Sequence, residues 1–273
     1  MQLSFEFFPP RTDQGKHNLK QVRQELSSVQ PHYFSTTFGA GGTTQEATLE
    51  TVLDIQANDK VSAAPHLSCI DSEKSKILAL LNQYKDAGIN RIVALRGDIP
   101  SGVRDIGDFH YASELVAFIR HEFNDHFHIE VAAYPEMHPQ AKNINTDIQH
   151  FANKMKAGAD SAITQYFYNV DAYLRFVDDV QKLGIDAPIT PGIMPITNHD
   201  QLLRFSNMCG AEIPRWIEKR LAVFGDDLES LSAFGLEVVN NLCDQLKTQG
   251  VENFHFYTMN KSQPSLALVK NLL

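Results

Sequence analysis

Short β-branched or aromatic runs alternate with longer stretches of helical spacing along this chain, and this alternation constrains its fold more than any other feature. Strands that alternate with helices form parallel sheets with helical crossovers. Eight such units in 273 residues predict an α/β fold, a (β/α)8 TIM barrel rather than an open doubly wound sheet. The predicted strands are Leu3–Phe8, Tyr33–Phe38, Ala63–Cys69, Arg91–Gly97, Ile129–Tyr134, Ala162–Phe167, Ile189–Met194 and Phe254–Met259.

Helices are predicted between these runs, and two of them end at glycines, Gly88 and Gly184, that can adopt a left-handed conformation. The predicted helices are His17–Ser28, Gln45–Ala57, Glu73–Ala87, Tyr111–Glu122, Thr146–Ala157 and Asp171–Leu183. The connection between the seventh and eighth strands is much longer than the others. It has room for extra helices near Asp200–Met208, Pro214–Val223 and Leu228–Thr248. We expect an elaborated seventh unit rather than a second domain, so that residues 1–273 form one catalytic barrel.

Composition favours a small-molecule role. The formal net charge of -9, with no cluster of Lys and Arg to offset it, argues against a nucleic-acid or anionic-membrane partner. Three widely spaced cysteines indicate reduced, mostly buried thiols rather than a disulfide framework or a zinc site. No apolar run approaches the eighteen or so residues of a membrane span, and the start has no signal-peptide pattern, so we expect a cytoplasmic protein.

The first predicted strand carries a carboxylate inside an aromatic run, Phe5-Glu6-Phe7-Phe8, and two prolines end it. Strand side chains alternate between faces, so Glu6 lies on the face opposite Phe5 and Phe7. We expect its side chain to point inward with few neighbouring side chains. Burying a lone carboxylate is costly and raises its pKa, which suits a general acid. A salt bridge at a strand end explains these residues equally well.

Polar residues gather where the predicted strands end, which is where barrels place their chemistry. Each of these residues alone is best explained as a satisfied structural group, but together on one rim they favour a site. They are Glu6, Thr37, His66, Arg96, Gly97, Asp98, Tyr134, His138, Gln165 and Tyr257. On the helix after the fifth strand, Asp147 and Lys154 lie seven residues apart and therefore share a face.

Two motif-like stretches do not meet the requirements of their motifs. The run from Gly39 to Gly42 resembles half a dinucleotide fingerprint, but threonine stands where the last glycine is needed. A flexible loop and a close backbone approach to a flat ligand both explain it. His121 and His126 are one residue too far apart to chelate zinc from one helix face, so no metal site is predicted. His110, His126 and His128 are interpreted as surface histidines.

Seven segments together strongly resemble the methylenetetrahydrofolate reductase family, in order and spacing, from residue 3 to about residue 261. They are FEFFPP at 5–10, APHL at 64–67, ALRGD at 94–98, AYPEMHP at 133–139, ITQYF at 163–167, PGIMP at 191–195 and FHFYT at 254–258. The similarity is greatest to the short bacterial type. It implies a barrel flavoprotein that contains FAD and uses NADH or NADPH to reduce 5,10-methylenetetrahydrofolate to 5-methyltetrahydrofolate, by ping-pong transfer through the flavin. This reaction belongs to one-carbon metabolism and methionine synthesis. The resemblance also implies a homo-oligomer.

The resemblance assigns roles at matching positions. Glu6 matches the general acid, and Asp98 matches a carboxylate beside the flavin. The flavin and nucleotide positions are Thr37, Ala40, His66, Arg96, Gly97, Asp98, Tyr111, Tyr134, His138, Ala141, Asp147 and Lys154. The folate and nicotinamide positions are Gln165, Gln201, Phe205, Tyr257 and Lys261. We expect Glu6 to be protonated part of the time, and Asp98, beside Arg96, to stay charged.

The sequence departs from the family pattern at Gln45 and Ala47, where relatives commonly have arginines, at Lys261, where some have arginine, and at Met259, where a leucine is replaced. A lysine in place of arginine replaces bidentate hydrogen bonding to the folate tail with a single point-charge contact. Two other functions stay open. A flavin-free barrel lyase or aldolase would require a strand-end lysine or a metal cluster, and neither is evident. A folate- or flavin-binding barrel without turnover would keep the same rim.

Overall fold

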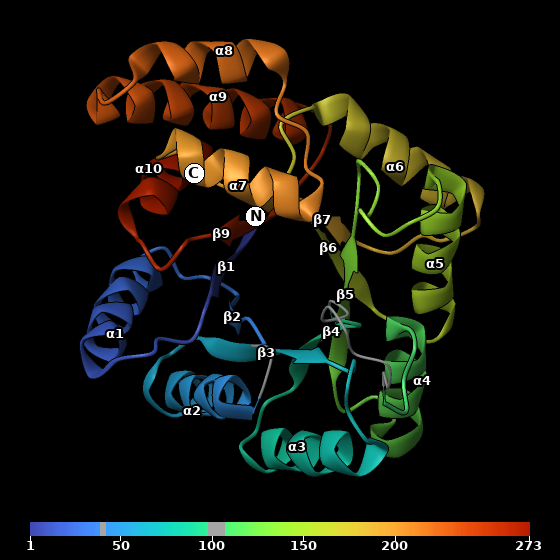
Figure 1. The fold of residues 1–273 in the computed structure, drawn as a ribbon. Helices are drawn as coiled ribbons and strands as arrows, with labels where there is room; N and C mark the ends of the chain where they lie inside the picture. The colour runs from blue at the N-terminus through green and yellow to red at the C-terminus, as the bar shows by residue number, and fades with distance from the viewer. Residues whose placement is uncertain (39–41, 98–106) are drawn as a thin grey trace.

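The structure, a computed structural model, describes residues 1–38, 42–97 and 107–273, without the side chains of residues 42–44. In this part of the chain, parallel strands form a ring surrounded by helices (Figure 1). The strands are β1 (Gln2–Phe7), β2 (Tyr33–Thr36), β3 (Ser62–Ser68), β4 (Arg91–Leu95), β5 (His128–Ala133), β6 (Ser161–Thr164), β7 (Ile189–Thr190), β8 (Gly192–Ile193) and β9 (Asn253–Tyr257). The (β/α)8 barrel predicted from the sequence is confirmed.

The seventh strand position holds two short strands, because Pro191 interrupts it. β7 pairs with β6, β8 pairs with β9, and β9 pairs with β1, so the chain through Pro191 closes the ring. A proline has no backbone N–H to donate to a neighbouring strand. Its carbonyl still accepts a hydrogen bond from the N–H of His255, at 3.1 Å. The predicted seventh strand is therefore present as two pieces that each bond to a different neighbour.

The helices follow the predicted order with small shifts at their ends. They are α1 (Asp13–Ser27), α2 (Gly42–Asn58), α3 (Lys74–Asp86), α4 (Ala112–Phe123), α5 (Ile144–Lys156), α6 (Val170–Lys182), α7 (His199–Cys209), α8 (Arg215–Phe224), α9 (Leu228–Thr248) and α10 (Gln263–Leu272). The three extra helices before the last strand, α7 to α9, are confirmed, whereas α10 was not predicted. Gly88 and Gly184 both have φ of 76°, as expected for residues that end helices.

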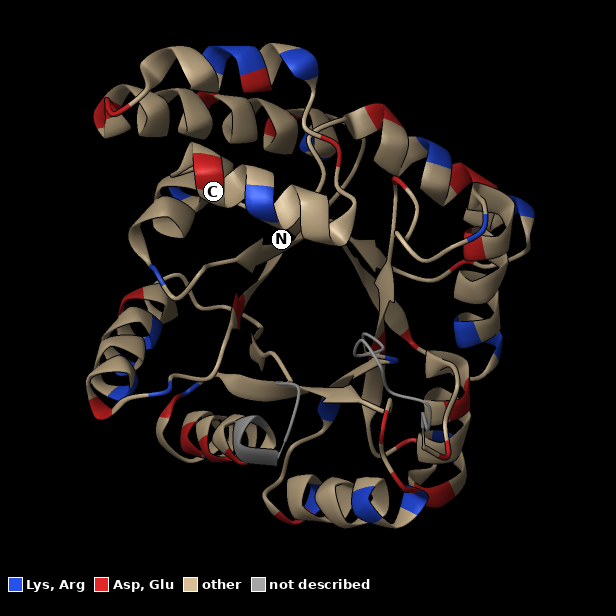
Figure 2. Ribbon diagram, in the orientation of Figure 1, with Lys and Arg blue, Asp and Glu red and all other residues tan. Residues whose placement is uncertain are grey.

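The main core lies between the strands and the helices. The outward side chains of β1, namely Leu3, Phe5 and Phe7, are buried there. Charged residues gather on the outer helices, while the strands carry few of them (Figure 2). Cys69 and Cys243 are buried and Cys209 is half-buried, and all three are free thiols. Within the described residues, no helix has the length and apolar character needed to cross a membrane.

Candidate active site

Glu6 lies at the carboxyl end of β1 between two histidines. Its Oε2 atom is 3.3 Å from Nε2 of His66 on β3 and 3.4 Å from Nε2 of His255 on β9. The other ring nitrogen of His255, Nδ1, lies 2.7 Å from the hydroxyl of Ser4. Ser4 and His255 are strand partners in adjacent positions, so closure of the barrel creates this cluster. Glu6 faces inward as predicted, but it is not alone.

The two imidazoles change the ionisation of Glu6. Burial by itself would raise the pKa of this carboxyl group, but the charges and hydrogen bonds of His66 and His255 outweigh burial and lower the pKa to about 2. The expectation that Glu6 is protonated part of the time is therefore wrong for this arrangement. A carboxylate held between two imidazoles must receive a proton before it can act as an acid.

A second set of contacts fixes the end of β1. The hydroxyl of Thr258 donates to the backbone oxygen of Glu6 at 2.6 Å, and the N–H of Thr258 donates to the same oxygen at 3.3 Å. The N–H of Thr37 donates to the backbone oxygen of Phe7 at 2.9 Å. The strands on both sides of β1 thus hold Glu6 in place, and Thr37 lies beside the end of the strand that carries it.

A cavity of about 480 Å³ opens at the carboxyl ends of β4 and β5. Eight of the residues that the resemblance assigns to flavin and nucleotide binding line this cavity: Arg96, Gly97, Tyr111, Tyr134, His138, Ala141, Asp147 and Lys154. Thr37 and His66 lie instead on the β1 and β3 side of the barrel mouth. Ala40 and Asp98 lie outside the described residues. Most of the predicted set is therefore brought together in one place.

Lys154 is a half-buried cation of this cavity. Its Nζ donates to the backbone oxygen of Ala132 at 2.5 Å. Burial lowers the pKa of Lys154 to about 8, and Arg96 adds to the lowering while Asp147 opposes it. Asp147 accepts a hydrogen bond from the N–H of His138 at 2.7 Å, which ties α5 to the loop after β5. A lysine whose charge is disfavoured by burial is suited to an anionic partner, because the anion restores the charged form.

Arg96 and several rings complete the wall. Arg96 donates to the side chain of Gln140 and, at 3.1 Å, to the backbone oxygen of Gly97. The rings of Tyr134 and His138 meet edge to face at 4.6 Å, and Tyr111, which is half exposed, stacks on His150 at 5.3 Å. The cavity thus presents two cations together with aromatic faces and ring donors, a set suited to a pyrophosphate and a planar heterocycle.

Tyr257 lies beside the Glu6 cluster, with its ring 5.5 Å from that of His255. Its hydroxyl donates to the backbone oxygen of Thr164 at 2.7 Å, next to Gln165. Burial, then the charges of Glu6 and Tyr134, raise the pKa of Tyr257 well above its ordinary value. Gly192 makes room for the ring, since a Cβ atom there would lie 2.6 Å from Cε2 of Tyr257. Any larger residue at this position would displace the ring.

The other predicted substrate residues lie on neighbouring segments. Gln201 and Phe205 belong to α7, which is held to the barrel where the hydroxyl of Tyr166 lies 3.0 Å from that of Ser206. Gln165 accepts a hydrogen bond from the N–H of Tyr166 at 3.0 Å. Gln165, Tyr257 and α7 therefore border one side of the barrel mouth. Lys261 is exposed on the loop after β9.

His255 and Glu136 were not predicted as site residues from the sequence. His255 shares the inward face of β9 with Tyr257, so strand alternation was the signal that could have found it. Glu136 accepts a hydrogen bond from the N–H of Glu212 at 2.8 Å, which joins the loop after β5 to the loop after α7. Burial, with a further contribution from the charge of Glu212, raises the pKa of Glu136 to about 7.

No group of three or more His, Cys, Asp and Glu residues that could hold a metal ion occurs across residues 1–38, 42–97 and 107–273. His110 and His121 are exposed. His126 and His128 are only partly exposed, and Nε2 of His128 lies 2.8 Å from the hydroxyl of Ser161. His126 and His128 therefore lie at the surface but are partly covered, and Nε2 of His126 is 3.2 Å from the backbone oxygen of Ile89.

The fold and this arrangement of groups define an enzyme of the (β/α)8 barrel class, with a carboxylate, cations and aromatic rings at the carboxyl ends of its strands. The chain belongs to the methylenetetrahydrofolate reductase family, because the model of that family matches residues 1–273.

Similar proteins span bacteria and plants. The chain is 39% identical to 5,10-methylenetetrahydrofolate reductase of Escherichia coli strain K12 over 272 residues, which cover 99% of this chain and 90% of that protein. It is 41% identical to the enzyme of that name from Buchnera aphidicola subsp. Schizaphis graminum, over 96% of this chain and 88% of the other. A rice protein described as probable methylenetetrahydrofolate reductase (NADH) is 37% identical and is covered over 48% of its length.

A solved structure supports the fold. An uncharacterised Clostridium thermocellum protein, described as binding two copies of 5-methyl-5,6,7,8-tetrahydrofolic acid, superposes with a TM-score of 0.65 at 16% identity, over 99% of this chain and 93% of that chain. At this identity the likeness establishes the shared fold alone.

Proposed function

We propose that this protein reduces 5,10-methylenetetrahydrofolate to 5-methyltetrahydrofolate, with FAD as its cofactor and NADH or NADPH as the reductant. The observation that carries the proposal is the convergence of eight predicted flavin and nucleotide positions on one cavity. Membership of the family and the names of the bacterial relatives support the substrate. The rice relative's name favours NADH as the reductant.

The residues that line the cavity fit FAD. Lys154 and Arg96 offer cations to the pyrophosphate, and the lowered pKa of Lys154 makes an anionic ligand favourable there. Tyr134, His138 and Asp147 supply ring faces and hydrogen-bonding groups to the ribose and the heterocycle. Asp98 and Ala40 belong to the same proposed site. When bound, FAD supplies the means of passing a hydride equivalent from nicotinamide to folate, which no side chain can do.

Glu6 supplies the proton in this proposal. Its Oε2 atom protonates the nitrogen that leaves when the methylene bridge opens, which makes that nitrogen a better leaving group. His66 and His255 position the carboxyl group and can exchange protons with it. Tyr257, Gln165 and Phe205 orient the folate ring, Phe205 by stacking on its face, while Gln201 and Lys261 contact the rest of the substrate.

The test is anaerobic mixing of the purified, FAD-loaded protein with each nicotinamide and then with methylenetetrahydrofolate. We expect the yellow absorbance to bleach with NADH or NADPH and to return on addition of the folate, with 5-methyltetrahydrofolate as the product. Comparing the two bleaching rates identifies the preferred reductant.

The same experiment separates the alternatives. A colourless protein that takes up no added FAD would contradict the flavoenzyme assignment and favour a flavin-free lyase. A yellow protein that neither nicotinamide bleaches would favour a binding protein without turnover. We further propose a homo-oligomer that acts in the cytoplasm, and light scattering of the purified protein tests the assembly.

A further inference from the structure

Polar side chains occupy much of the amino-terminal half of the barrel interior, where (β/α)8 barrels usually hold layers of branched apolar side chains. Four of these polar residues are at most 5% exposed: Ser4, Glu130, Ser161 and His255. The buried apolar cluster beside them is small and consists of Tyr33, Ala64, Val93 and Ile163. Burying polar groups costs free energy unless each finds a partner. Packing alone does not account for this choice of residues.

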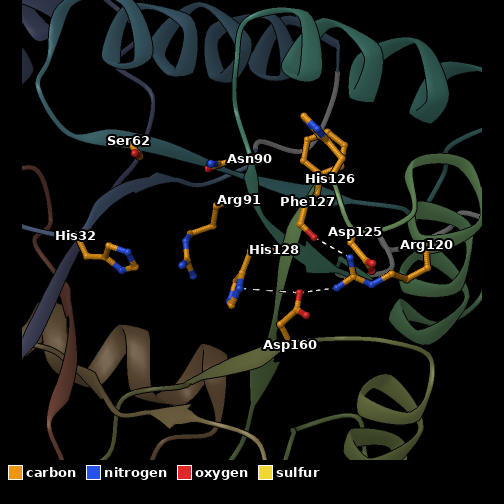
Figure 3. A pocket seen from close by; sticks show the side chains of 10 residues that line it. All are labelled: His32, Ser62, Asn90, Arg91, Arg120, Asp125, His126, Phe127, His128 and Asp160. Carbon is orange, nitrogen blue, oxygen red and sulfur yellow. Dashed lines mark hydrogen bonds and ion pairs between the residues drawn. The ribbon is translucent and has the colours of Figure 1, made fainter.

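Two cavities lead from the amino end of the barrel toward this interior. The outer one, of about 440 Å³, is bordered by Arg91, His128 and Asp160, with Arg120 bonded to Asp160 (Figure 3). The inner one, of about 240 Å³, reaches Ser4. His32, Arg91 and His128 line both cavities, so the two adjoin. Only these shared side chains therefore separate the outer cavity at the amino end of the barrel from the inner cavity that reaches Ser4.

The outer part of the inner cavity is lined by groups that can pass protons. Nε2 of His128 lies 2.8 Å from the hydroxyl of Ser161, which in turn donates to Oε1 of Glu130 at 3.2 Å. Arg91 lies 3.1 Å from that same oxygen. Oε2 of Glu130 is buried and makes no direct hydrogen bond to another described residue. A buried carboxylate oxygen beside a polar cavity is a place where an ordered water is favourable.

We call this series of polar groups the column. It consists of His128, Ser161, Glu130, Tyr33, Ser4 and His255, and its inner part reaches Glu6. Tyr33 lines the inner cavity together with Ser4 and Glu130. Burial, and after it the charge of Glu130, raises the pKa of the Tyr33 hydroxyl well above its ordinary value. Ser4 is 2.7 Å from Nδ1 of His255, and Nε2 of His255 is 3.4 Å from Oε2 of Glu6. Hydroxyls and imidazoles both donate and accept, so each member of this series can receive a proton and pass one on.

We propose that protons reach Glu6 from the amino-terminal end of the barrel, through the cavity lined by His128, Ser161, Glu130, Tyr33 and Ser4 and then through His255. This inference rests on the proposed function for the need of a proton and on the column of groups for its path. It gives the amino-terminal face of the barrel, opposite the substrate pocket, a part in turnover.

The reaction requires such a supply. In each turnover the nicotinamide is oxidised, the methylene carbon gains a hydride equivalent, and the carbon–nitrogen bond of the bridge breaks. The departing nitrogen keeps the electron pair and takes the proton from Glu6, so one proton is consumed. Substrates that fill the carboxyl end of the barrel exclude water from that side. A path from the opposite end lets Glu6 regain its proton while the site is covered.

If the column served only to stabilise the fold, the ion pair between Arg91 and Glu130 would be enough to neutralise its buried charges. That pair does not require the link from Ser4 to His255, nor a cavity that extends between them. Ser4 is hydrogen-bonded on the side of His255 that faces away from Glu6. An imidazole bonded on both nitrogens can release a proton at one as it receives a proton at the other.

The first test removes one hydroxyl from the column. Tyr33→Phe keeps the ring that stacks on His255 at 6.0 Å and lies under Arg91. We expect reduction of the folate to slow on the order of tenfold, less than the 10²- to 10⁴-fold expected for loss of the acid itself, with a larger solvent deuterium isotope effect. Reduction of the flavin by nicotinamide should be unchanged. Tyr84→Phe is the matched control, because Tyr84 is a buried tyrosine on α3 whose hydroxyl makes no hydrogen bond to other described residues.

The second variant tests the mouth of the path. His128→Ala should slow the folate step, and added imidazole should restore it, because a soluble base replaces the missing side chain. Parental folate rates in both Tyr33→Phe and His128→Ala would overturn the proposal. Equal slowing of flavin reduction and folate reduction, or no response to imidazole, would indicate loss of structure and would also overturn it.

A third measurement needs no turnover and therefore separates failure of this inference from failure of the proposed function. His255 is fully buried. In protein labelled with nitrogen-15 histidine, we expect its ring N–H to exchange with solvent much faster than the backbone N–H groups of β9, and Tyr33→Phe to slow this exchange about tenfold. Ring exchange as slow as backbone exchange in the parent would contradict a proton path, whatever reaction the protein catalyses.

Discussion

Two carboxylates inside the same barrel have opposite surroundings. Glu130, near the amino end, has a side chain that is 4% exposed and pairs with Arg91. Glu6, near the carboxyl end, has a side chain that is 16% exposed and is bordered by two histidines. An arginine keeps its proton at any pH that a folded protein survives, whereas an imidazole gains and loses one near neutrality.

The difference shows how one interior supports two tasks. The pair of Arg91 and Glu130 stabilises the fold and makes the inner cavity polar, and Glu130 also lies in the proposed proton path. In the cluster of Glu6, His66 and His255, each imidazole can both accept and donate a proton, which is what returning a proton to Glu6 requires. Replacing one carboxylate at a time separates these two tasks.

The largest effect is expected for Glu6→Gln. The amide keeps the size and part of the hydrogen bonding of the side chain but cannot donate the required proton. We expect reduction of methylenetetrahydrofolate to fall by about 10²- to 10⁴-fold, while reduction of the flavin by nicotinamide stays near the parental rate. Stopped-flow absorbance measures both steps. A parental rate of folate reduction would rule out Glu6 as the acid.

Glu130→Gln is expected to act mainly on stability. Removing one partner of a buried ion pair leaves Arg91 with an uncompensated charge, which costs about 3 kcal/mol of unfolding free energy. Urea denaturation measures the loss. The double variant Arg91→Met with Glu130→Gln should recover part of it, because neither charge is then left unpaired. If the single variant is as stable as the parent, the ion pair does not stabilise the fold as described here.

Glu136→Gln is expected to give the smallest effect, and one that depends on pH. The pKa of Glu136 is raised from 4.5 to about 7, so its ionised form disfavours the folded state. The parent should lose stability from this group as the pH rises from 4.5 through 7. The variant should lack that loss and be more stable than the parent at pH 8, on the order of 1 kcal/mol, and not at pH 4. Thermal unfolding at both pH values checks this, and an equal difference at the two pH values would contradict it.

Features that depend only on residues close together in the sequence, such as which side chains share a face of a strand, could be predicted from the sequence. Strand alternation placed Glu6 inward and Phe5 and Phe7 on the opposite face of the strand, because the period of two needs no knowledge of partners. The helix α10 was missed although Pro264 stands in its first turn, where proline is favoured. The split of the seventh strand at Pro191 follows from the missing N–H of proline and could have been predicted.

The surroundings of Glu6 could not be obtained in that way. His255 lies 249 residues away in sequence and meets Glu6 only because the last strand pairs with the first when the barrel closes. The pKa of Glu6 then depends on two imidazoles that outweigh burial, a balance that no pattern of residue types reveals. The site residues around Lys154 were found through resemblance, since a lysine on a helix face is ordinarily solvated.

Measuring the pKa of Glu6 tests most directly the contrast between the two carboxylates. Carbon-13 NMR of protein labelled at glutamate side-chain carboxyls, with the Glu6 signal identified by its absence in Glu6→Gln, would give its titration. We predict a pKa near 2, well below 4.5, and a higher pKa in His255→Gln, where burial is less opposed. A Glu6 signal that titrates at or above 4.5 in the parent, unchanged in His255→Gln, would contradict the account.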